Sequence, residues 1–184
     1  MMQFDKTWTL FLDRDGVINR HLPNEYVTQW SEFEFIEGSA EAIAMLSKHF
    51  GKIVVVTNQQ SVGKGLMSRQ TLEEIHFSMC EAIAAKGGRI DAVYYCPHLS
   101  SIQPKCRKPE IGMALEAKEE FPMIDFNRSI IVGDSDSDME LGNRLDMYCV
   151  RIHNPNTYKG EKALRIDAEF ASLMEFARTL QVDN

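Results

Sequence analysis

The segment TLFLDRDGVINR, residues 9 to 20, joins an apolar run to two acids. Residues 10 to 12 are typical of a buried strand, and Asp13 and Asp15 follow with a single residue between them. Side chains two residues apart on an extended chain point the same way, so both carboxylates face one place. Two carboxylates in one place repel each other and are costly to desolvate. The segment therefore predicts a positive group, such as a metal ion, at the end of this strand.

Length, composition and charge limit the class of protein. The 184 residues are enough for one domain with a sizeable core, and we expect a single domain over residues 1–184. The formal net charge of −7 argues against a protein that binds nucleic acid or an anionic membrane through a broad basic surface. The N-terminal residues lack a signal-peptide core, and no apolar stretch is long enough to span a bilayer.

The cysteines indicate a compartment. Four cysteines are too few and too scattered for a disulfide scaffold, so they favour a reducing cytoplasm. We expect a cytoplasmic monomer with a small-molecule partner. The cysteines are Cys80, Cys96, Cys106 and Cys149.

Apolar segments alternate along the chain with segments of helical periodicity. This alternation predicts an α/β fold, a three-layer Rossmann-like parallel sheet with helices on both faces and right-handed crossovers. Ligands bind such a sheet beyond the carboxyl ends of its strands. Strands are expected at 7–13, 52–58, 91–96, 129–134 and 147–152. Helices are expected at 39–50, 69–86, 109–121, 136–145 and 171–180.

Three of the expected strands end in polar residues. The segments are DRDG at 13–16, TNQ at 57–59 and GDSDSD at 133–138. Because the carboxyl ends of parallel strands lie at one edge of a sheet, these segments are expected to converge. Carboxylates, carbonyls and waters suit Mg²⁺, which keeps open positions for phosphate oxygens. Asp13 and Asp134 therefore predict a magnesium site.

The same segments could carry out phosphoryl transfer. With Mg²⁺ bound, one carboxylate of the Asp-x-Asp pair can act as a nucleophile and the other can carry a proton to the leaving oxygen. Thr57 and Asn58 can donate hydrogen bonds to a phosphoryl group, and Lys108 can offset negative charge there. Each segment alone is compatible with a turn, a helix N-terminus or surface charge. Their occurrence together, in this order, favours the chemistry.

The segments DRDG, TN, KP and GDSDSD resemble the four motifs of the haloacid dehalogenase-like phosphatases. The resemblance implies that Asp13 forms an aspartyl-phosphate and that Asp15 is the general acid and then the general base. It also implies that Thr57 and Lys108 bind phosphoryl oxygens. The residues implied to hold Mg²⁺ are Asp13, the backbone carbonyl of Asp15, and Asp134, with Asp138 close behind.

The segments FLDRDGVIN, VVVTNQ, YYCPH and CRKPEIGM are similar to one branch of this family. That branch holds D-glycero-D-manno-heptose 1,7-bisphosphate phosphatases and histidinol-phosphate phosphatases, and it lacks a large cap domain. The spacings here leave no room for such a cap, so the loops at 19–37, 60–67 and 97–107 are expected to shape the pocket. The branch usually has a small or acidic residue and then glycine after TNQ, whereas this chain has Gln60 and Ser61.

Three functions are compatible with these residues. The favoured one is a Mg²⁺-dependent phosphomonoesterase that removes the C7 phosphate of D-glycero-D-manno-heptose 1,7-bisphosphate, because the segment NEYVTQWSEFEFIEG is closer to the heptose enzymes. Lys64 and Arg107 are the expected ligands of the second phosphate, although Lys64 is equally compatible with a solvent-facing position. The alternatives are a histidinol-phosphate phosphatase and a catalytically silent phosphosugar-binding domain.

The loop CPHLSSIQPKCRKP, residues 96 to 109, resembles an incomplete zinc site. Cys96, His98 and Cys106 are potential ligands, but Pro104 stands where related phosphatases have a further cysteine. Structural zinc almost always takes four ligands, and a missing thiolate weakens binding. We therefore expect no stoichiometric zinc, and we expect Cys96 and Cys106 to be free thiols.

Overall fold

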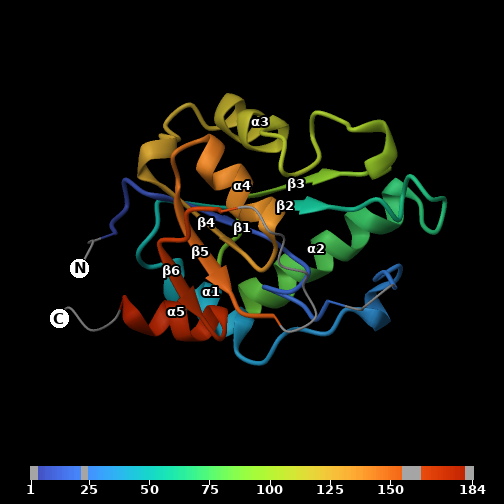
Figure 1. The fold of residues 1–184 in the computed structure, drawn as a ribbon. Helices are drawn as coiled ribbons and strands as arrows, with labels where there is room; N and C mark the ends of the chain where they lie inside the picture. Colours follow the sequence, from blue (N-terminus) through green and yellow to red (C-terminus); the bar gives the residue numbers. More distant parts are fainter. Residues whose placement is uncertain (1–3, 22–24, 155–162, 181–184) are drawn as a thin grey trace.

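The computed structural model describes residues 4–21, 25–154 and 163–180. Its strands form one six-stranded sheet in the order β3-β2-β1-β4-β5-β6, and every neighbouring pair is parallel (Figure 1). All five expected strands are present, which confirms the predicted α/β class. The bounds are β1 Thr9–Leu12, β2 Lys52–Asn58, β3 Ala92–Cys96, β4 Ser129–Gly133, β5 Tyr148–Ile152 and β6 Ala168–Phe170.

Helices cover both faces of the sheet, as the predicted three-layer architecture requires. Helices α1, α2 and α5 pack on one face, and α3 and α4 pack on the other (Figure 1). Three short 3₁₀ helices lie in the connecting segments. The α-helices are α1 Ser39–Leu46, α2 Arg69–Ala85, α3 Gly112–Glu120, α4 Asp136–Arg144 and α5 Leu173–Thr179, and the 3₁₀ helices are η1 Trp30–Glu32, η2 Ser100–Ile102 and η3 Phe126–Arg128.

Strand β1 lies in the interior of the sheet. Its side chains contribute to two hydrophobic cores, one on each face of the sheet. Leu10 and Leu12 belong to the core under α1, α2 and α5, whereas Phe11 belongs to the core under α3 and α4. All three side chains are fully buried. Because successive side chains alternate across a strand, a strand covered on both faces is apolar at every position. This explains why the opening segment reads as a continuous apolar run.

The elements that differ most from the sequence expectation are α1, which ends at Leu46 and not at residue 50, the additional strand β6, and the start of α3. Strand β6 was not expected, because it is a three-residue edge strand with a partly exposed pattern that gives no periodic signal. Helix α3 begins at Gly112 and not at Pro109. The residues before it form turns, in which the backbone N–H groups of Arg107 and Glu110 donate to the carbonyls of Pro104 and Arg107.

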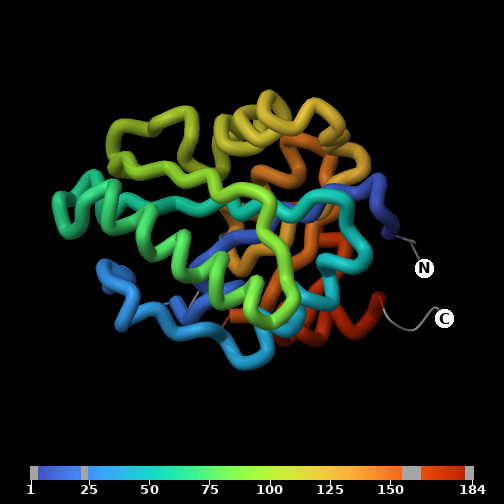
Figure 2. The backbone as a smooth tube through the Cα atoms, turned by 180° about the vertical axis from the view of Figure 1, so that it is seen from behind, coloured from blue at the N-terminus to red at the C-terminus, as the bar shows by residue number. Residues whose placement is uncertain are grey.

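Three loops gather at the carboxyl end of the sheet (Figure 2). The amide of Gln60 donates to the hydroxyl of Tyr26 at 2.9 Å, and the N–H of Gly63 donates to the carbonyl of Pro97 at 2.8 Å. These contacts join segments from the three loops that were expected to shape the pocket. In the described part of the chain these loops carry no separate cap domain. None of the helices described there combines the length and the apolar character that a membrane span needs.

Candidate active site

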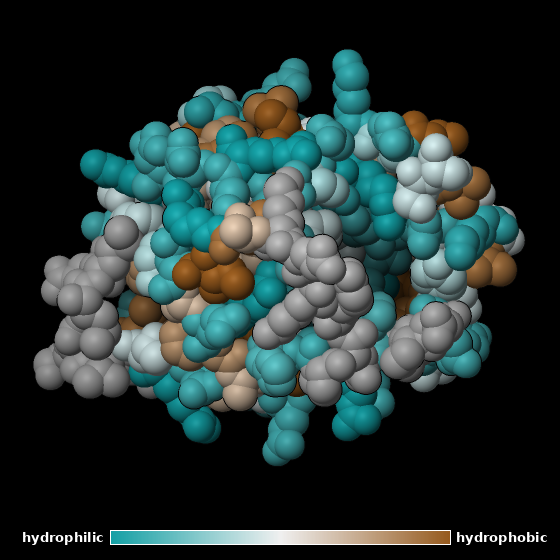
Figure 3. All heavy atoms as spheres, viewed as in Figure 1, coloured by the Kyte–Doolittle hydropathy of each residue, from teal (hydrophilic) through white to brown (hydrophobic). Residues whose placement is uncertain are grey.

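The polar strand ends converge as the sequence predicts. Strand β1 lies between β2 and β4, and Leu12 is in register with both Val55 and Val132. Asp13 and Asp134 therefore leave the sheet side by side, with the last residues of β2 next to them. A pocket of about 410 Å³ opens at this edge. Figure 3 shows a hollow with mainly hydrophilic walls at this end of the sheet.

Three buried carboxylates cluster at this edge, and two of them, Asp13 and Asp134, line the pocket. Asp13, Asp134 and Asp138 each offer an oxygen, and these oxygens lie within 4.8 Å of one another. Two glycines make this approach possible. A Cβ on Gly16 would lie 2.1 Å from Oδ2 of Asp134, and a Cβ on Gly133 would lie 2.2 Å from the Cβ of Asp138. Any larger residue at either position would therefore push a carboxylate out of place.

Lys108 is the cation at this cluster. Its Nζ lies 2.8 Å from Oδ1 of Asp13 and 2.6 Å from Oδ1 of Asp138, and it donates to the carbonyl of Val56 at 2.9 Å. These contacts use all three ammonium protons. Burial alone would lower the pKa of Lys108, but the carboxylates of Asp13 and Asp138 outweigh it and raise that pKa. The side chain therefore stays charged next to Asp13.

One lysine does not neutralise three acids. Burial raises the pKa of Asp13 to about 8, against the attraction of Lys108 and with further repulsion from Asp138 and Asp134. A divalent cation next to Asp13 would reverse this, because an opposite charge favours the ionised form. All the donors are hard oxygens, the type that Mg²⁺ prefers. The chemistry of the donor set therefore fits the expected magnesium ion.

Asp138 is not part of the pocket wall, and both of its carboxylate oxygens contact neighbouring residues. Its Oδ1 faces Lys108, and its Oδ2 accepts from the N–H and the hydroxyl of Ser135 at 3.1 and 2.5 Å. The contact with Ser135 completes a capping box at the start of α4. Asp134 accepts a hydrogen bond from Asn154 at 2.7 Å. The start of α4 thus fixes Asp138, and the end of β4 positions Asp134.

Asp15 is held by a dense set of donors. Nη2 of Arg14 lies 2.9 and 3.0 Å from its two oxygens, and the amides of Asn19 and Gln59 donate to it at 2.9 and 2.7 Å. Burial raises the pKa of Asp15, but Arg14, Asn19 and Gln59 more than offset it and leave that pKa below its usual value. Arg14 itself donates to Nε2 of His76 on α2 at 3.2 Å. The protein therefore holds Asp15 as a carboxylate.

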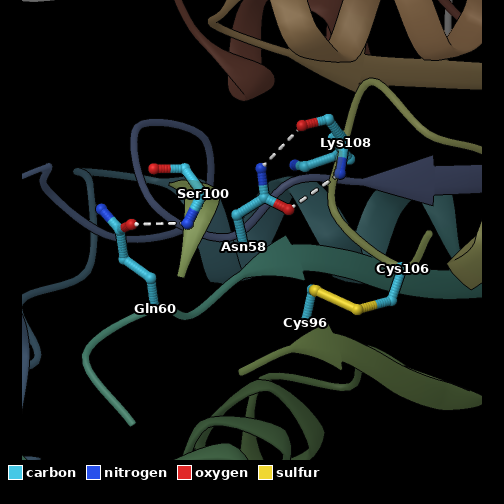
Figure 4. The surroundings of a disulfide bond; sticks show 6 residues. All are labelled: Asn58, Gln60, Cys96, Ser100, Cys106 and Lys108. Carbon is cyan, nitrogen blue, oxygen red and sulfur yellow. Dashed lines mark hydrogen bonds between the residues drawn. A yellow bond between two sulfur atoms is a disulfide. The ribbon is translucent and has the colours of Figure 1, made fainter. Parts of the chain in front are cut away.

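Asn58 contacts the main chain of Lys108. Its Oδ1 accepts from the Lys108 N–H at 3.0 Å, and its Nδ2 donates to the Lys108 carbonyl at 3.2 Å (Figure 4). The sequence assigned Asn58 to the phosphoryl group, and the side chain does line the pocket. The structure gives it the additional task of holding the loop that carries Lys108 against the end of β2.

The two cations expected at a second phosphate lie in different environments. Arg107 lines the pocket, and its Nη1 is buried without a hydrogen-bond partner in the described part of the chain. Lys64 is exposed and is not part of the pocket wall. Its ammonium donates to the hydroxyl of Tyr26 at 2.8 Å and lies 4.9 Å from that ring's centroid. Tyr26, which does line the pocket, stands between Lys64 and the interior.

The expectation of free thiols at Cys96 and Cys106 is wrong. The structure joins the two residues in a disulfide across a separation of ten residues (Figure 4). Cys96 ends β3 and Cys106 precedes Arg107, and the turns of the intervening loop bring the two together. A disulfide and a zinc ion would compete for the same two sulfurs. The absence of zinc stays a prediction.

Comparisons with known proteins assign the family. Residues 2–178 match the family model described as polynucleotide kinase 3 phosphatase. The chain is 42% identical over 173 residues to the D-glycero-alpha-D-manno-heptose-1,7-bisphosphate 7-phosphatase of Mycobacterium bovis, covering 92% of this chain and 90% of that protein. It is 35% identical to the enzyme of the same name from Campylobacter jejuni, covering 85% of this chain and 88% of that protein. The chain therefore belongs to this family of haloacid dehalogenase-like phosphatases.

A solved structure supports the same assignment. The D,D-heptose 1,7-bisphosphate phosphatase from B. bronchiseptica, complexed with magnesium and phosphate, superposes with a TM-score of 0.86 at 29% identity. The match covers 96% of this chain and 99% of that chain. The expected resemblance to the heptose bisphosphate phosphatase branch is thus confirmed.

Sequence reasoning missed three residues that the structure brings to the site or its support. Gln59 contacts Asp15, Tyr26 lines the pocket, and His76 contacts Arg14. Gln59 was visible as part of TNQ, but its side-chain partners were not. His76 lies at a buried position of the α2 pattern and resembles an ordinary core residue. Its partner is 62 residues away in the sequence, so no local signal could have identified it.

Proposed function

We propose that this chain is a Mg²⁺-dependent phosphomonoesterase that removes the C7 phosphate of D-glycero-D-manno-heptose 1,7-bisphosphate through an aspartyl-phosphate. The observation that carries the proposal is the arrangement of Asp13 next to Lys108 and Asp134, with Arg107 further along the same pocket. The pocket thus offers one place for a reacting phosphate and a separate cation for a remote one. The relatives named above support the choice of sugar.

Mg²⁺ would be held by Asp13, Asp134 and the backbone carbonyl of Asp15, and it would supply positive charge to the phosphoryl oxygens when bound. The hydroxyl of Thr57 would bind a further phosphoryl oxygen, and Lys108, next to Asp13, would offset the negative charge of the phosphoryl group. Lys108 also keeps Asp13 oriented, because its Nζ contacts Oδ1 of Asp13. These groups place positive charge and hydrogen-bond donors where negative charge develops on the phosphoryl oxygens during transfer.

The reaction proceeds in two steps. A carboxylate oxygen of Asp13 attacks phosphorus, the bond from phosphorus to the sugar oxygen breaks, and Asp15 donates a proton to that oxygen. Asp15 then takes a proton from water, which attacks phosphorus and releases phosphate and the free Asp13 carboxylate. The lowered pKa of Asp15 suits the second step. The dianionic substrate would favour its protonation before the first step, because a nearby negative charge raises a carboxyl pKa.

The second phosphate is proposed to bind Arg107. An unpartnered Nη1 in a buried position is costly unless a ligand satisfies it. Tyr26 presents its hydroxyl to the same pocket, with Lys64 behind it. Because both relatives compared above are named for the α anomer, we propose the α-configured bisphosphate as the preferred form.

Histidinol phosphate fits less well, because it has no second anion for Arg107. A silent binding domain would not need the intact set of Asp13, Asp15 and Lys108. A polynucleotide end is disfavoured by the net charge of −7. We further propose that the chain is a single phosphatase domain and a monomer. We place it in the cytoplasm, where phosphorylated sugars are retained.

A phosphate-release screen tests the proposal. Wild-type protein with Mg²⁺ is offered the α and β heptose bisphosphates, the heptose 1-phosphate and 7-phosphate, histidinol phosphate and a 3′-phosphorylated oligonucleotide. The expected result is the highest kcat/KM for the α bisphosphate, with the 1-phosphate as product. Preference for histidinol phosphate or the oligonucleotide would replace the proposed substrate. Binding of bisphosphate without turnover would indicate the silent domain.

A further inference from the structure

Gln59 lies between two groups to which the proposed function gives different tasks. Its amide nitrogen Nε2 is 2.7 Å from Oδ2 of Asp15 and 2.9 Å from Oγ1 of Thr57. The side chain lines the pocket and is 3% exposed. Its backbone N–H donates to the carbonyl of Cys96 at 2.8 Å, which fixes the residue at the end of β2 against β3.

The chemistry of the groups decides the direction of both bonds. An ionised carboxylate only accepts, so the amide must turn its nitrogen toward Asp15. The other N–H of Nε2 then points to Oγ1 of Thr57, which accepts. A hydroxyl has a single proton. Since the Thr57 oxygen accepts from Gln59, its proton points elsewhere and is available to a phosphoryl oxygen.

The surroundings of Asp15 distinguish its two oxygens. Oδ1 is enclosed by Arg14 and Asn19, which are 1% and 0% exposed. Oδ2 contacts the same Arg14 nitrogen and, on its other side, only Gln59 among the described residues. These four contacts fill the acceptor positions of a carboxylate. The contact that a substrate can replace from within the pocket is the one with Gln59, because Asn19 is fully buried.

We propose that Gln59 is a positioning residue that presents Oδ2 of Asp15 as the proton-transferring atom and holds the Thr57 hydroxyl as a donor to the phosphoryl group. This inference rests on the proposed function. When the sugar oxygen arrives at Oδ2 it takes the place of the Gln59 contact, and the amide keeps its bond to Thr57. The Gln59 side chain thus positions two groups at once. It directs Asp15 toward the leaving oxygen, and it directs the Thr57 hydroxyl toward the phosphoryl group that is transferred.

A comparison of two substrates with different leaving groups distinguishes this positioning role from a purely structural one. Proton donation matters for a sugar alkoxide and matters little for an aryl oxide, which leaves without a proton. The parameter to measure is kcat/KM, because it covers the steps up to formation of the aspartyl-phosphate. The probes are the heptose bisphosphate and p-nitrophenyl phosphate, both with Mg²⁺.

The main variant is Gln59→Met, which keeps the length of the side chain and removes both donors. Its kcat/KM is expected to fall about 100-fold for the bisphosphate and about 10-fold for the aryl phosphate, since both reactions lose the ordered Thr57 hydroxyl but only the first loses the ordered acid. Gln59→Glu is the polar counterpart. Its ionised side chain cannot donate to Asp15, so the same selective loss is expected. Gln70→Met is the control, since Gln70 is exposed and bonds Glu74 on α2.

A double-mutant cycle with Asp15→Asn completes the test. In that background no carboxyl remains to position, so Gln59→Met should lower kcat/KM equally for both probes. Equal losses for both probes in the single variant would overturn the proposal, and so would a selective loss that persists with Asp15→Asn. Wild-type enzyme that hydrolyses neither probe would overturn the proposed function itself. Active wild-type enzyme with an unaffected Gln59→Met variant would overturn only the positioning role.

Discussion

The sheet edge formed by β1, β2 and β4 and the loop at 97–107 both supply the pocket, but different interactions hold them in place. At the edge, Asp13 and Asp134 directly follow paired strands, so the backbone hydrogen bonds of the sheet set their positions. The loop has one 3₁₀ turn and no strand of its own. It is attached by the Cys96–Cys106 disulfide and by the contacts of Asn58 with Lys108.

This difference separates the two parts by task. The edge carries the groups that react, which must stay within a few tenths of an ångström of their productive geometry. The loop carries Arg107, a group that meets a remote part of the substrate. We therefore expect changes at the edge to abolish the chemical step and changes in the loop to alter binding, selectivity or stability.

The largest effect is expected at the edge. Asp13→Asn removes the nucleophile while keeping its shape, and kcat should fall about 10⁴-fold or more. Phosphate release from the heptose bisphosphate measures the loss, and a thermal melt checks that the variant is folded. A variant that retains a tenth of wild-type turnover would show that Asp13 is not the nucleophile.

The next effect distinguishes the two cations of the loops. Arg107→Ala should lower kcat/KM for the bisphosphate about 100-fold and for the heptose 7-phosphate only slightly, because only the first substrate has a remote anion. Lys64→Ala is the matched control, since Lys64 contacts Tyr26 outside the pocket wall. It should cost less than about 5-fold on either substrate. Uniform losses for Arg107→Ala would remove the second phosphate site.

The disulfide should matter for stability and not for chemistry. Closing a ten-residue loop is expected to stabilise the fold by roughly 2–3 kcal/mol in the chain-entropy treatment. Urea unfolding of wild type with and without a phosphine reductant measures this difference. Cys106→Ser should remove the response to reductant, whereas Cys80→Ser should keep it, because Cys80 is a free thiol. A wild-type curve that does not respond to reductant would contradict the cross-link.

The smallest effect is expected in the pH dependence of stability. It involves His76, which contacts Arg14 behind the sheet edge. Burial lowers the pKa of His76 to about 3, with a further contribution from the Arg14 charge and against that of Asp15. Between this value and the ordinary pKa of 6.5 the unfolded chain binds a proton that the folded chain does not. This contribution to stability is therefore fully present above pH 6.5 and is lost as the pH falls toward 3.

His76→Gln tests this dependence, because glutamine can accept from Arg14 and does not titrate. Thermal midpoints of the two proteins from pH 7 to pH 4 give the comparison. The wild type should lose more stability on acidification than the variant, by roughly 1–3 kcal/mol at pH 4. Parallel curves for the two proteins would show that His76 is protonated to the same extent in the folded and unfolded chains.

The sheet edge could be predicted from the sequence more fully than the loop at 97–107. The convergence of Asp13, Thr57 and Asp134 followed from strand ends alone, because parallel strands place their carboxyl ends at one edge. No such rule predicts the positions of residues in the loop at 97–107. Its cysteines could be counted and compared with zinc ligands, but whether Cys96 and Cys106 meet depends on the path of the chain between them.

The sequence by itself determined the alternation of strands and helices, the acids at the strand ends, and the family to which the motifs belong. Only the tertiary structure decided the partners of these groups. It placed Gln59 between Asp15 and Thr57, set His76 behind Arg14, and kept Lys64 outside the pocket. The physical reason is that periodicity is a property of neighbours along the chain. Hydrogen bonds between side chains far apart in sequence exist only once the sheet and its helices have packed.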